Sequence, residues 1–307
     1  MTTQSPILDS SHAAFLKDAG WDDADARPLA GDASTRRYVR LSKGGRPAVF
    51  MIAPPAAESA PCPPNASAVE REKLGYNAAA RLAGPNLNAF VAIADALRGA
   101  GFSAPEVYAA DAGQGLALIE DLGDDLYARV IGKADEEEIY GAATDMLAAM
   151  RQNPPQRPTK NVFQMLDYDK TALLAEAALL IDWYWPLKKG APASNDLKAE
   201  YIDAVSSAVY HLSPPHSFVL RDFHAENLLW LPERNDAARV GLIDFQDGLY
   251  GAAAYDLVSL LEDARRDVAP DLAAAMIDRY CKKAQEADDF DREAFLRDYA
   301  ILGAQRN

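Results

Sequence analysis

Two apolar runs that flank a polar turn constrain the local fold of this chain more than any other feature. Residues 228–231 and 240–243 are apolar, and residues 232–236 between them are rich in turn formers. Two apolar runs joined in this way predict a β-hairpin. In a hairpin the residue before the first strand, Asn227, lies close to the residue after the second strand, Asp244. The sequence therefore predicts that these two side chains share one small site.

A third polar residue, Asp222, lies five positions before Asn227 and follows a short apolar run at residues 219–220. Phosphoryl transfer from a nucleoside triphosphate depends on positioning and charge neutralisation, and it needs a carboxylate beside the acceptor hydroxyl. It also needs hard oxygen ligands for magnesium. We therefore predict Asp222 as the catalytic residue, and Asn227 and Asp244 as magnesium ligands. The alternative, ordinary turn residues, accounts for any one of the three but not for all three at this spacing.

The segment around Asp222 resembles the catalytic segment of the aminoglycoside phosphotransferase and choline kinase-like family, which shares the protein-kinase fold. That family usually reads His-Gly-Asp-x-x-x-x-Asn and then Ile-Asp-Phe or Ile-Asp-Trp, and residues 242–245 here read Leu-Ile-Asp-Phe. Leu220 and Arg221 stand where the family usually has His-Gly. The resemblance implies an α+β, two-lobed protein-kinase-like fold, with an antiparallel sheet and a helix in the N-terminal lobe and a mainly helical C-terminal lobe. It also implies ATP and Mg²⁺ as cofactors.

The composition is that of a globular protein and argues against several classes of function. The chain has 307 residues, enough for two lobes, and a net charge of −15 from 31 basic and 46 acidic residues. This balance argues against a general nucleic-acid binder, which needs clustered Lys and Arg. There is no apolar run of about 18 residues and no signal-like N-terminus, so we expect a cytoplasmic protein without a membrane span. Cys62 and Cys281 are expected as reduced thiols, and no obligate protein partner is evident.

A polar segment followed by two strands, at residues 38–41 and 48–52, has the order expected of a nucleotide-covering hairpin. Backbone N–H groups and hydroxyls in the polar segment suit triphosphate oxygens, and arginines there add positive charge. The segment resembles the Asp-Ala-Ser-x-Arg-Arg-Tyr stretch of the N-acetylmuramate and N-acetylglucosamine anomeric sugar kinases, a cell-wall-recycling branch of the family. The alternative is a simple turn with solvated arginines. The residues predicted to bind nucleotide are Ser34, Thr35, Arg36 and Arg37.

The second of these strands lacks the lysine that the kinase fold uses to bind phosphates and to pair with a helix glutamate. It ends Phe-Met-Ile-Ala-Pro-Pro at residues 50–55, and the sugar kinase branch has a similar Leu-Met-Asp-Ala-Pro-Pro ending. We expect Arg36 or Arg37 to supply the charge. The alternative is a catalytically weak, pseudokinase-type nucleotide-binding module. A helix predicted at residues 69–82 looks like an insertion relative to the branch, and its glutamates are expected to face solvent.

A second strand pair, at residues 107–111 and 116–120, runs into the segment Glu-Asp-Leu-Gly-Asp at residues 120–124. This segment resembles the hinge of the family, in which backbone groups meet the adenine edge, so Glu120 and Leu122 are predicted to bind nucleotide. The alternative is a polar loop after a strand. The resemblance gives a nucleotide-covering lobe at residues 1–122, a hinge at about residues 119–124, and a catalytic and substrate lobe at residues 123–307. Helices are expected at residues 11–19, 90–97, 135–152, 168–185 and 196–212.

Three residues are candidates for substrate contact. Residues 182–185 read Asp-Trp-Tyr-Trp and resemble the Glu-Trp-Tyr segment of the anomeric sugar kinases. Aromatic faces suit the apolar face of a sugar ring, so Trp183 is predicted to contact substrate; aromatics at helical spacing equally suit a protein core. Gln246 and Asp247 follow the predicted magnesium ligand, and their type is typical of the branch. They are expected to face the substrate or to cap the next helix.

Three further residues are implied to support the site. Residues 251–257 resemble the Gly-x-x-x-Tyr-Asp-Leu of the family, which makes Asp256 a buried carboxylate bonded to the catalytic loop and to Arg221. A buried charge needs a partner, so such a contact is expected. His224, two residues after Asp222, is expected to orient the catalytic loop through a hydrogen bond.

The resemblance implies transfer of phosphate from ATP to the anomeric hydroxyl of N-acetylmuramate or N-acetylglucosamine, a small-molecule sugar substrate. An aminoglycoside, or another small alcohol such as choline, is the alternative acceptor. Proteins of the branch continue past a segment like the Gln305-Arg306 pair found here. The resemblance therefore implies further residues beyond Asn307.

Overall fold

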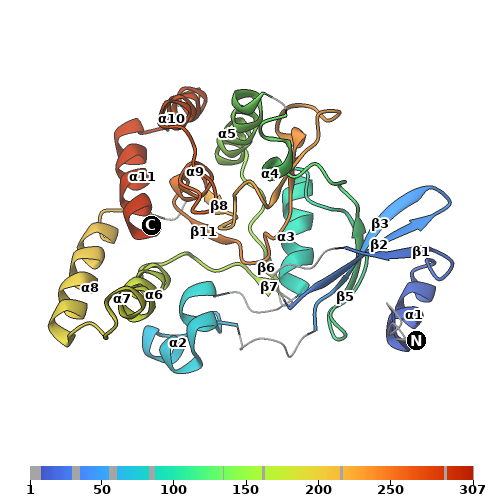
Figure 1. The fold of residues 1–307 in the computed structure, drawn as a ribbon, viewed down its shortest axis with the longest axis horizontal. Helices are drawn as coiled ribbons and strands as arrows, with labels where there is room; N and C mark the ends of the chain where they lie inside the picture. Colours follow the sequence, from blue (N-terminus) through green and yellow to red (C-terminus); the bar gives the residue numbers. More distant parts are fainter. Residues whose placement is uncertain are drawn as a thin grey trace.

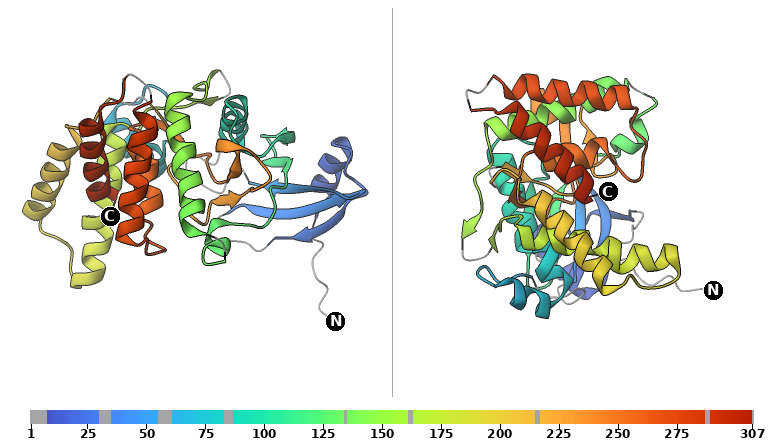
Figure 2. Two further views of the ribbon diagram at one scale, coloured as in Figure 1. Left: turned by 90° about the horizontal axis from the view of Figure 1, so that it is seen from above. Right: turned by 90° about the vertical axis from the view of Figure 1, so that its left-hand side faces the viewer.

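The computed structural model describes residues 8–29, 35–54, 61–82, 87–133, 135–160, 163–214, 217–286 and 289–306. A β-sheet with a short helix forms one end of the molecule, and mainly helices form the rest (Figure 1). The left view of Figure 2 shows the same division, with the red C-terminal helices far from the blue strands. This α+β arrangement agrees with the predicted fold class. Among the described residues, no helix combines the length and the apolar character that crossing a membrane requires.

The N-terminal sheet is antiparallel and has the strand order β1-β2-β3-β5-β4. In its central hairpin, β2 (Arg37–Lys43) pairs with β3 (Arg46–Ile52) across Gly44 and Gly45. The two glycines have positive φ angles of 56° and 80°, which a tight hairpin turn needs and which glycine adopts without a steric cost. The other strands are β1 (Asp25–Pro28), β4 (Val107–Asp111) and β5 (Leu116–Glu120). The pairing of β2 with β3 and of β4 with β5 confirms both predicted strand pairs.

Alternate side chains of β3 enter two different cores. Phe50 packs with α1 (Ser10–Asp18), whose residues His12 and Phe15 contact its ring. Its neighbour Met51 belongs to the larger core, which includes the apolar face of α3 (Leu87–Gly99). Successive side chains of a strand point to opposite faces, so the sheet is covered by α1 on one face and by α3 on the other.

Two helices predicted as continuous are interrupted. The predicted helix at residues 69–82 forms α2 (Ala68–Leu74) and the π-helical turn η1 (Asn77–Arg81), because Gly75 between them has a φ of 98°. Glu70 and Glu72 face solvent, as expected. The helix predicted at residues 168–185 forms three consecutive pieces: α6 (Lys170–Leu179), the π-helical turn η2 (Leu180–Tyr184) and α7 (Trp185–Lys189).

The rest of the chain is mainly helical. Asp135 caps α5 (Glu136–Gln152) and Ser194 caps α8 (Asn195–Val209), so both predicted helices are confirmed. The helices predicted at residues 11–19 and 90–97 are confirmed as α1 and α3. The other helices are α4 (Tyr127–Val130), α9 (Ala254–Leu261), α10 (Pro270–Ala284) and α11 (Arg292–Arg306), and a short pair of strands is β6 (Thr159–Lys160) with β7 (Phe163–Gln164).

The predicted hairpin is present as β9 (Leu228–Trp230) and β10 (Val240–Leu242), with Trp230 opposite Val240. The turn between them contains the 3₁₀-helix η3 (Asp236–Arg239). A Cβ at Gly241 would lie 3.0 Å from the Leu229 Cβ, so the close pairing favours glycine there. Two further strands, β8 (Ser217–Val219) and β11 (Leu249–Gly251), pair antiparallel and are labelled near the centre of Figure 1.

The strand β5 ends at Glu120, inside the segment predicted as a hinge. Beyond it the described chain is mainly helical, as expected for a second lobe. The lobe boundary at residue 122 stays a prediction.

One aromatic contact joins the hairpin segment to the helix that covers the sheet. Phe245, which follows β10, stacks on Phe90 of α3 with ring centroids 5.0 Å apart and an angle of 16° between the rings. Phe245 is 1% exposed. The stack therefore fixes the chain just after Asp244 against the N-terminal half of the molecule.

Substitution Phe245→Ala should lower the free energy of unfolding by about 3–5 kcal/mol, because it removes buried apolar contacts and leaves a cavity. Urea denaturation followed by circular dichroism measures this change. Val69→Ala removes apolar atoms from a side chain that is 59% exposed, and it is expected to change stability by less than about 0.5 kcal/mol. Equal stability of the two variants would contradict a structural role for the stack.

Candidate active site

Three predicted site residues come together where short strands end. Asp222 follows β8, Asn227 precedes β9 and Asp244 follows β10. The Asn227 Nδ2 donates a hydrogen bond to the Asp222 carbonyl oxygen at 3.1 Å and lies 3.5 Å from the Asp244 Oδ2. The predicted closeness of Asn227 and Asp244 is therefore confirmed. Their roles as magnesium ligands, and that of Asp222 as the catalytic residue, stay predictions.

The backbone before Asp222 is held by the buried carboxylate of Asp256. The backbone N–H groups of Leu220 and Arg221 donate to its two oxygens at 2.7 and 2.9 Å. Burial raises the pKa of Asp256 to about 7, although these two hydrogen bonds oppose the shift. The expected bond between Asp256 and the catalytic loop is confirmed. Arg221 contacts Asp256 through its backbone N–H. Its side chain is directed at Glu176 instead.

The Arg221 side chain is buried and links three segments. Its guanidinium forms an ion pair with Glu176 of α6 and lies over the ring of Tyr168, 5.2 Å from the ring centroid. It also donates to the carbonyl oxygens of Ala80 and Arg81 in η1, at 3.4 and 3.1 Å. Burial is the largest single influence on Arg221 and opposes its charge, but Glu176, Tyr168 and other neighbours together outweigh it, so the pKa of Arg221 is raised.

Two non-glycine residues of the site adopt left-handed backbone conformations. Arg221 has a φ of 69° and Asp244 a φ of 58°. A side chain makes this conformation costly, and such residues persist only where the surroundings hold them. Arg221 stands at the position where the resembling family usually has glycine, the residue that adopts positive φ most readily. The contacts of Asp256 and Glu176 with Arg221 therefore offset the conformational free energy of its left-handed backbone.

His224 is a neutral neighbour of Asn227. Its Nε2 lies 3.3 Å from the Asn227 Nδ2, and the amide NH₂ is a donor, so the Nε2 acts as acceptor. The imidazole is buried, and burial, followed by the charge of Arg265, lowers its pKa. His224 was expected to orient the catalytic loop through a hydrogen bond. The structure provides that contact through Asn227.

Arg36, which precedes β2 of the N-terminal sheet, contacts the predicted metal site. Its Nη1 lies 2.8 Å from the Asp244 Oδ1, which also accepts a hydrogen bond from the Gln246 amide at 2.9 Å. By contrast, the side chains of Thr35 and Arg37 are exposed. Ser34 lies outside the described residues. Of the two arginines predicted to supply the missing charge, Arg36 is thus the one directed at Asp244.

Asp247 is buried and pairs with a residue of η1. The Arg81 Nε and Nη2 donate to its Oδ2 at 2.8 and 2.5 Å. Its Oδ1 has no hydrogen-bond partner among the described residues. Burial raises the pKa of Asp247, although Arg81 opposes this shift. Gln246 and Asp247 thus face other protein side chains in the structure, and a contact of either with substrate stays a prediction.

The predicted hinge residues lie at the end of β5. The Glu120 carboxylate pairs with Arg234 at 2.6 Å and with Arg98 at 3.2 Å, and its backbone N–H donates to the Glu106 carbonyl. Leu122 is half-buried beside Gly241 of the hairpin. These contacts fix the segment in place. Nucleotide binding by Glu120 and Leu122 stays a prediction.

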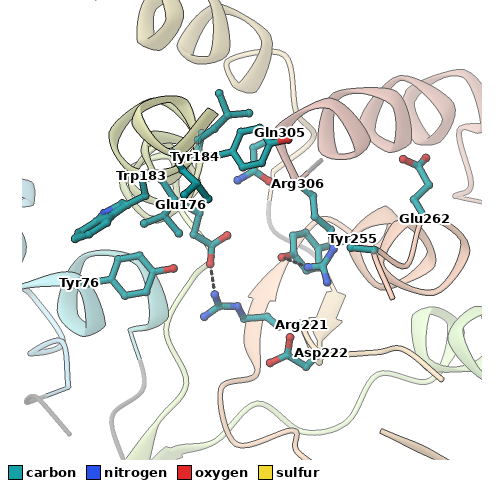
Figure 3. Close-up of a pocket in the computed structure, with 15 residues that line it drawn as sticks. Tyr76, Glu176, Trp183, Tyr184, Arg221, Asp222, Tyr255, Glu262, Gln305 and Arg306 are labelled. Carbon is teal, nitrogen blue, oxygen red and sulfur yellow. Dashed lines mark hydrogen bonds and ion pairs between the residues drawn. The ribbon is translucent and has the colours of Figure 1, made fainter. Parts of the chain in front are cut away.

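A cavity of about 960 Å³ opens beside Asp222 (Figure 3). The side chains of Trp183 and Tyr184 line it and are 74% and 54% exposed. The alternative interpretation, that these two aromatics belong to a core, is therefore wrong. The other labelled residues of the lining are Tyr76, Glu176, Arg221, Tyr255, Glu262, Gln305 and Arg306.

Glu176 and Tyr76 are lining residues that the sequence motifs did not indicate, although Glu176 has a recognisable sequence context. It is the one charged residue between Lys170 and Asp182, in a run of mostly apolar residues. A lone charge in an apolar helix implies a buried partner. The sequence offers no way to identify that partner as Arg221, because 45 positions separate the two residues.

The residues at the hairpin fit a magnesium ion. Among the described residues, no group of three or more His, Cys, Asp or Glu side chains is arranged to hold a metal ion. Magnesium does not need such a cage, since it is usually bound by one or two carboxylates together with phosphate oxygens and water. The Asp244 carboxylate already attracts a cation, the Arg36 guanidinium. Asp244, with the amide oxygen of Asn227, is therefore a suitable donor set.

The chain is similar to known phosphotransferases in sequence and in fold. A sequence model described as the phosphotransferase enzyme family matches residues 25–296. An N-acetylmuramate/N-acetylglucosamine kinase of Caulobacter vibrioides is 44% identical over 98% of this chain and 84% of the relative. A protein of the same name from Pseudomonas aeruginosa is 31% identical over 98% of this chain and 80% of the relative.

Solved structures agree with the fold. An ADP-bound aminoglycoside phosphotransferase superimposes with a TM-score of 0.56 and 16% identity, and it covers 97% of this chain and 98% of its own. An ethanolamine kinase of Plasmodium vivax gives a TM-score of 0.55 at 11% identity, over 93% of this chain and 74% of its own. At such low identity these likenesses concern the fold, which is that of the kinase-like phosphotransferases.

The neutral state of His224 predicts a pH dependence of stability. Its pKa in the folded protein lies below the ordinary value of about 6.5, so the unfolded chain binds the proton more readily. The contribution of His224 is therefore complete above about pH 6.5 and declines as the pH falls through this value. We expect His224→Gln to weaken the loss of unfolding free energy between pH 8 and pH 5.5, measured by urea denaturation at both pH values.

The exposed His211 provides a matched control. His211→Gln is expected to retain the full loss of stability between the two pH values. The same pH dependence in both variants would contradict a buried neutral His224.

Proposed function

This chain belongs to the phosphotransferase enzyme family, and we propose that it phosphorylates the anomeric hydroxyl of N-acetylmuramate or N-acetylglucosamine with ATP and magnesium. The observation that carries the proposal is the position of Asp222. Its side chain lines the large cavity, while its backbone carbonyl is bonded to Asn227 beside Asp244. One residue thus connects a space for an acceptor with a site for a metal-bound nucleotide. The two relatives from Caulobacter vibrioides and Pseudomonas aeruginosa bear the names of kinases of these two sugars.

Asp222 acts as the base for the acceptor. Its carboxylate accepts a hydrogen bond from the sugar hydroxyl and orients the oxygen towards the γ-phosphorus. The new P–O bond forms as the bond between the γ-phosphorus and the β–γ bridging oxygen breaks, and ADP leaves. The hydroxyl proton passes to the Asp222 carboxylate and then to solvent.

Asn227 and Asp244 are the residues that would hold the magnesium ion, which would supply positive charge against the phosphate oxygens. Asn227 is fixed for this task by its hydrogen bond to the Asp222 carbonyl and by the neighbouring His224. The left-handed backbone at Asp244 directs its carboxylate towards Arg36 and Asn227.

Arg36 takes the part of the strand lysine that this chain lacks. Its guanidinium pairs with Asp244 in the structure, and the residue immediately precedes β2, the strand that follows the predicted phosphate-binding loop. An arginine at this place is always charged and offers several N–H donors to phosphate oxygens. The absence of the lysine therefore does not by itself make the protein an inactive nucleotide-binding module.

The cavity suits a sugar. Its volume of about 960 Å³ exceeds what a single small alcohol fills, and its lining combines aromatic rings with charged groups. Trp183 and Tyr184 offer apolar faces for a sugar ring, and Glu262 and Arg306 offer polar groups for its hydroxyls. We propose that the enzyme acts on small molecules in the cytoplasm.

A direct test follows ADP release with Mg-ATP and three acceptors: N-acetylmuramate, N-acetylglucosamine and kanamycin. The proposal expects turnover with the acetylated sugars and none with kanamycin. Turnover with kanamycin alone would establish an aminoglycoside kinase instead. Calorimetric binding of ATP without turnover of any acceptor would establish a nucleotide-binding module.

Substitution Asp222→Asn should reduce kcat with the sugar by about 10²–10⁴-fold, because the amide cannot accept the hydroxyl proton. ATP affinity, measured by calorimetry, should stay unchanged, since the backbone carbonyl that bonds Asn227 is retained. Glu233→Gln changes an exposed carboxylate in the turn after β9 and serves as the control, with normal kcat expected. A near-normal kcat for Asp222→Asn would refute its role as base.

Substitution Arg36→Gln should weaken ATP binding about 10- to 100-fold, since a charge-assisted hydrogen bond contributes about 1.5–3 kcal/mol. Calorimetry with ATP in the presence of EDTA measures the effect without any metal. Arg37→Gln should change ATP affinity much less, and the reverse result would transfer the role to Arg37. Arg27→Gln, at an exposed position of β1, controls for the lost positive charge.

A further inference from the structure

We propose that the segment from Ala68 to Arg81, here called the α2–η1 wall, forms one side of the acceptor site, and that Tyr76 on this wall binds the sugar ring. This inference rests on the proposed function and adds a residue that determines acceptor affinity. The wall corresponds to the part of the sequence that looks like an insertion relative to the sugar kinase branch. The acceptor site of this chain is therefore built from both halves of the sequence.

The position of Tyr76 follows from the break between α2 and η1. Gly75 has a φ of 98°, which ends α2 and redirects the chain immediately before Tyr76. The Tyr76 side chain then lines the cavity and keeps 44% of its surface exposed. In Figure 3 its ring lies on the same side of the cavity as Trp183, and its hydroxyl points towards the Glu176–Arg221 pair. A continuous helix would lack this turn.

The wall is fixed at its N-terminal end by an ion pair with α6. The Arg71 Nη1 donates to both carboxylate oxygens of Asp169, at 2.9 and 2.7 Å. Asp169 is also the residue that caps α6, through the backbone N–H of Ala172. The chain of α6 continues into η2, which carries Trp183. One rigid unit thus presents both aromatic residues to the cavity.

The C-terminal end of the wall is fixed to the catalytic segments. Arg81 pairs with the buried Asp247, three residues after Asp244. The carbonyl oxygens of Ala80 and Arg81 accept hydrogen bonds from the Arg221 guanidinium, next in sequence to Asp222. The wall therefore has a defined position relative to both aspartates, which an independent surface helix would not have.

The chemistry of the wall favours a ring-shaped acceptor. Tyr76 and Trp183 present aromatic surfaces, and neither ring is buried by the protein itself. The apolar face of a pyranose covers such a surface and recovers hydrophobic and dispersion energy. Burial raises the pKa of Tyr76, so its hydroxyl stays protonated and can donate a hydrogen bond to a sugar oxygen. A linear amino alcohol covers much less of the two rings.

The experiment compares Tyr76→Ala and Tyr76→Phe with Leu74→Ala, using the sugar that the wild-type protein phosphorylates. Leu74 belongs to the same wall, is 43% exposed and is absent from the cavity lining. Tyr76→Ala should raise the KM for the sugar about tenfold, with KM for ATP within about twofold of wild type. Tyr76→Phe keeps the ring and should stay within about threefold of wild type, and Leu74→Ala should match wild type.

A binding measurement separates affinity from turnover. Calorimetric titration of the sugar into each variant should show the same loss for Tyr76→Ala and no loss for Leu74→Ala. If the wild-type protein phosphorylates the sugar and Tyr76→Ala and Leu74→Ala have equal KM values, Tyr76 does not bind the sugar ring, and the proposed function is unaffected. A wild-type protein that neither binds nor phosphorylates the sugars would overturn both.

Discussion

The buried guanidinium of Arg221 is the interaction on which the arrangement of the site depends. It bonds both to Glu176 on α6 and to the C-terminal end of η1, while the backbone of the same residue is held by Asp256. A buried charge is tolerated only with partners of this kind, and removal of any one leaves an uncompensated group. Because Asp222 is the next residue, its position is fixed by contacts made through Arg221.

The same residue explains how this chain departs from the pattern that it resembles. Glycine meets the left-handed backbone of that position at little cost, but it offers no side chain. Arginine adopts this conformation, with a φ of 69°, at some cost in strain. Its side chain provides the N–H donors that hold η1 and α6 together. The Arg221 side chain thereby anchors the helical segment that ends in η1 beside Asp222. A glycine there would leave the half-buried Glu176 without its cation.

The sequence predicts those parts of the site that depend on neighbouring residues. The hairpin, and with it the closeness of Asn227 and Asp244, follows from two apolar runs and a turn within a short stretch. Contacts between distant segments leave no comparable pattern: Arg221 with Glu176, Arg36 with Asp244, and Arg81 with Asp247 each join residues far apart in the chain. The break at Gly75 was missed because glycine occurs inside helices as well as at their ends.

Polar cross-links of this kind occur in a chain that lacks the strand lysine which, in the kinase fold, pairs with a helix glutamate. The strand β3 carries no lysine, yet Arg36 connects the start of β2 to Asp244, and Arg81 connects η1 to Asp247. Both arginines therefore contact the same short segment after β10, Arg36 from the chain just before β2 and Arg81 from η1. The Phe90–Phe245 stack holds that segment against α3 between them. The geometry at Asp244 thus depends on several separate contacts, and the loss of one lysine is compatible with an ordered site.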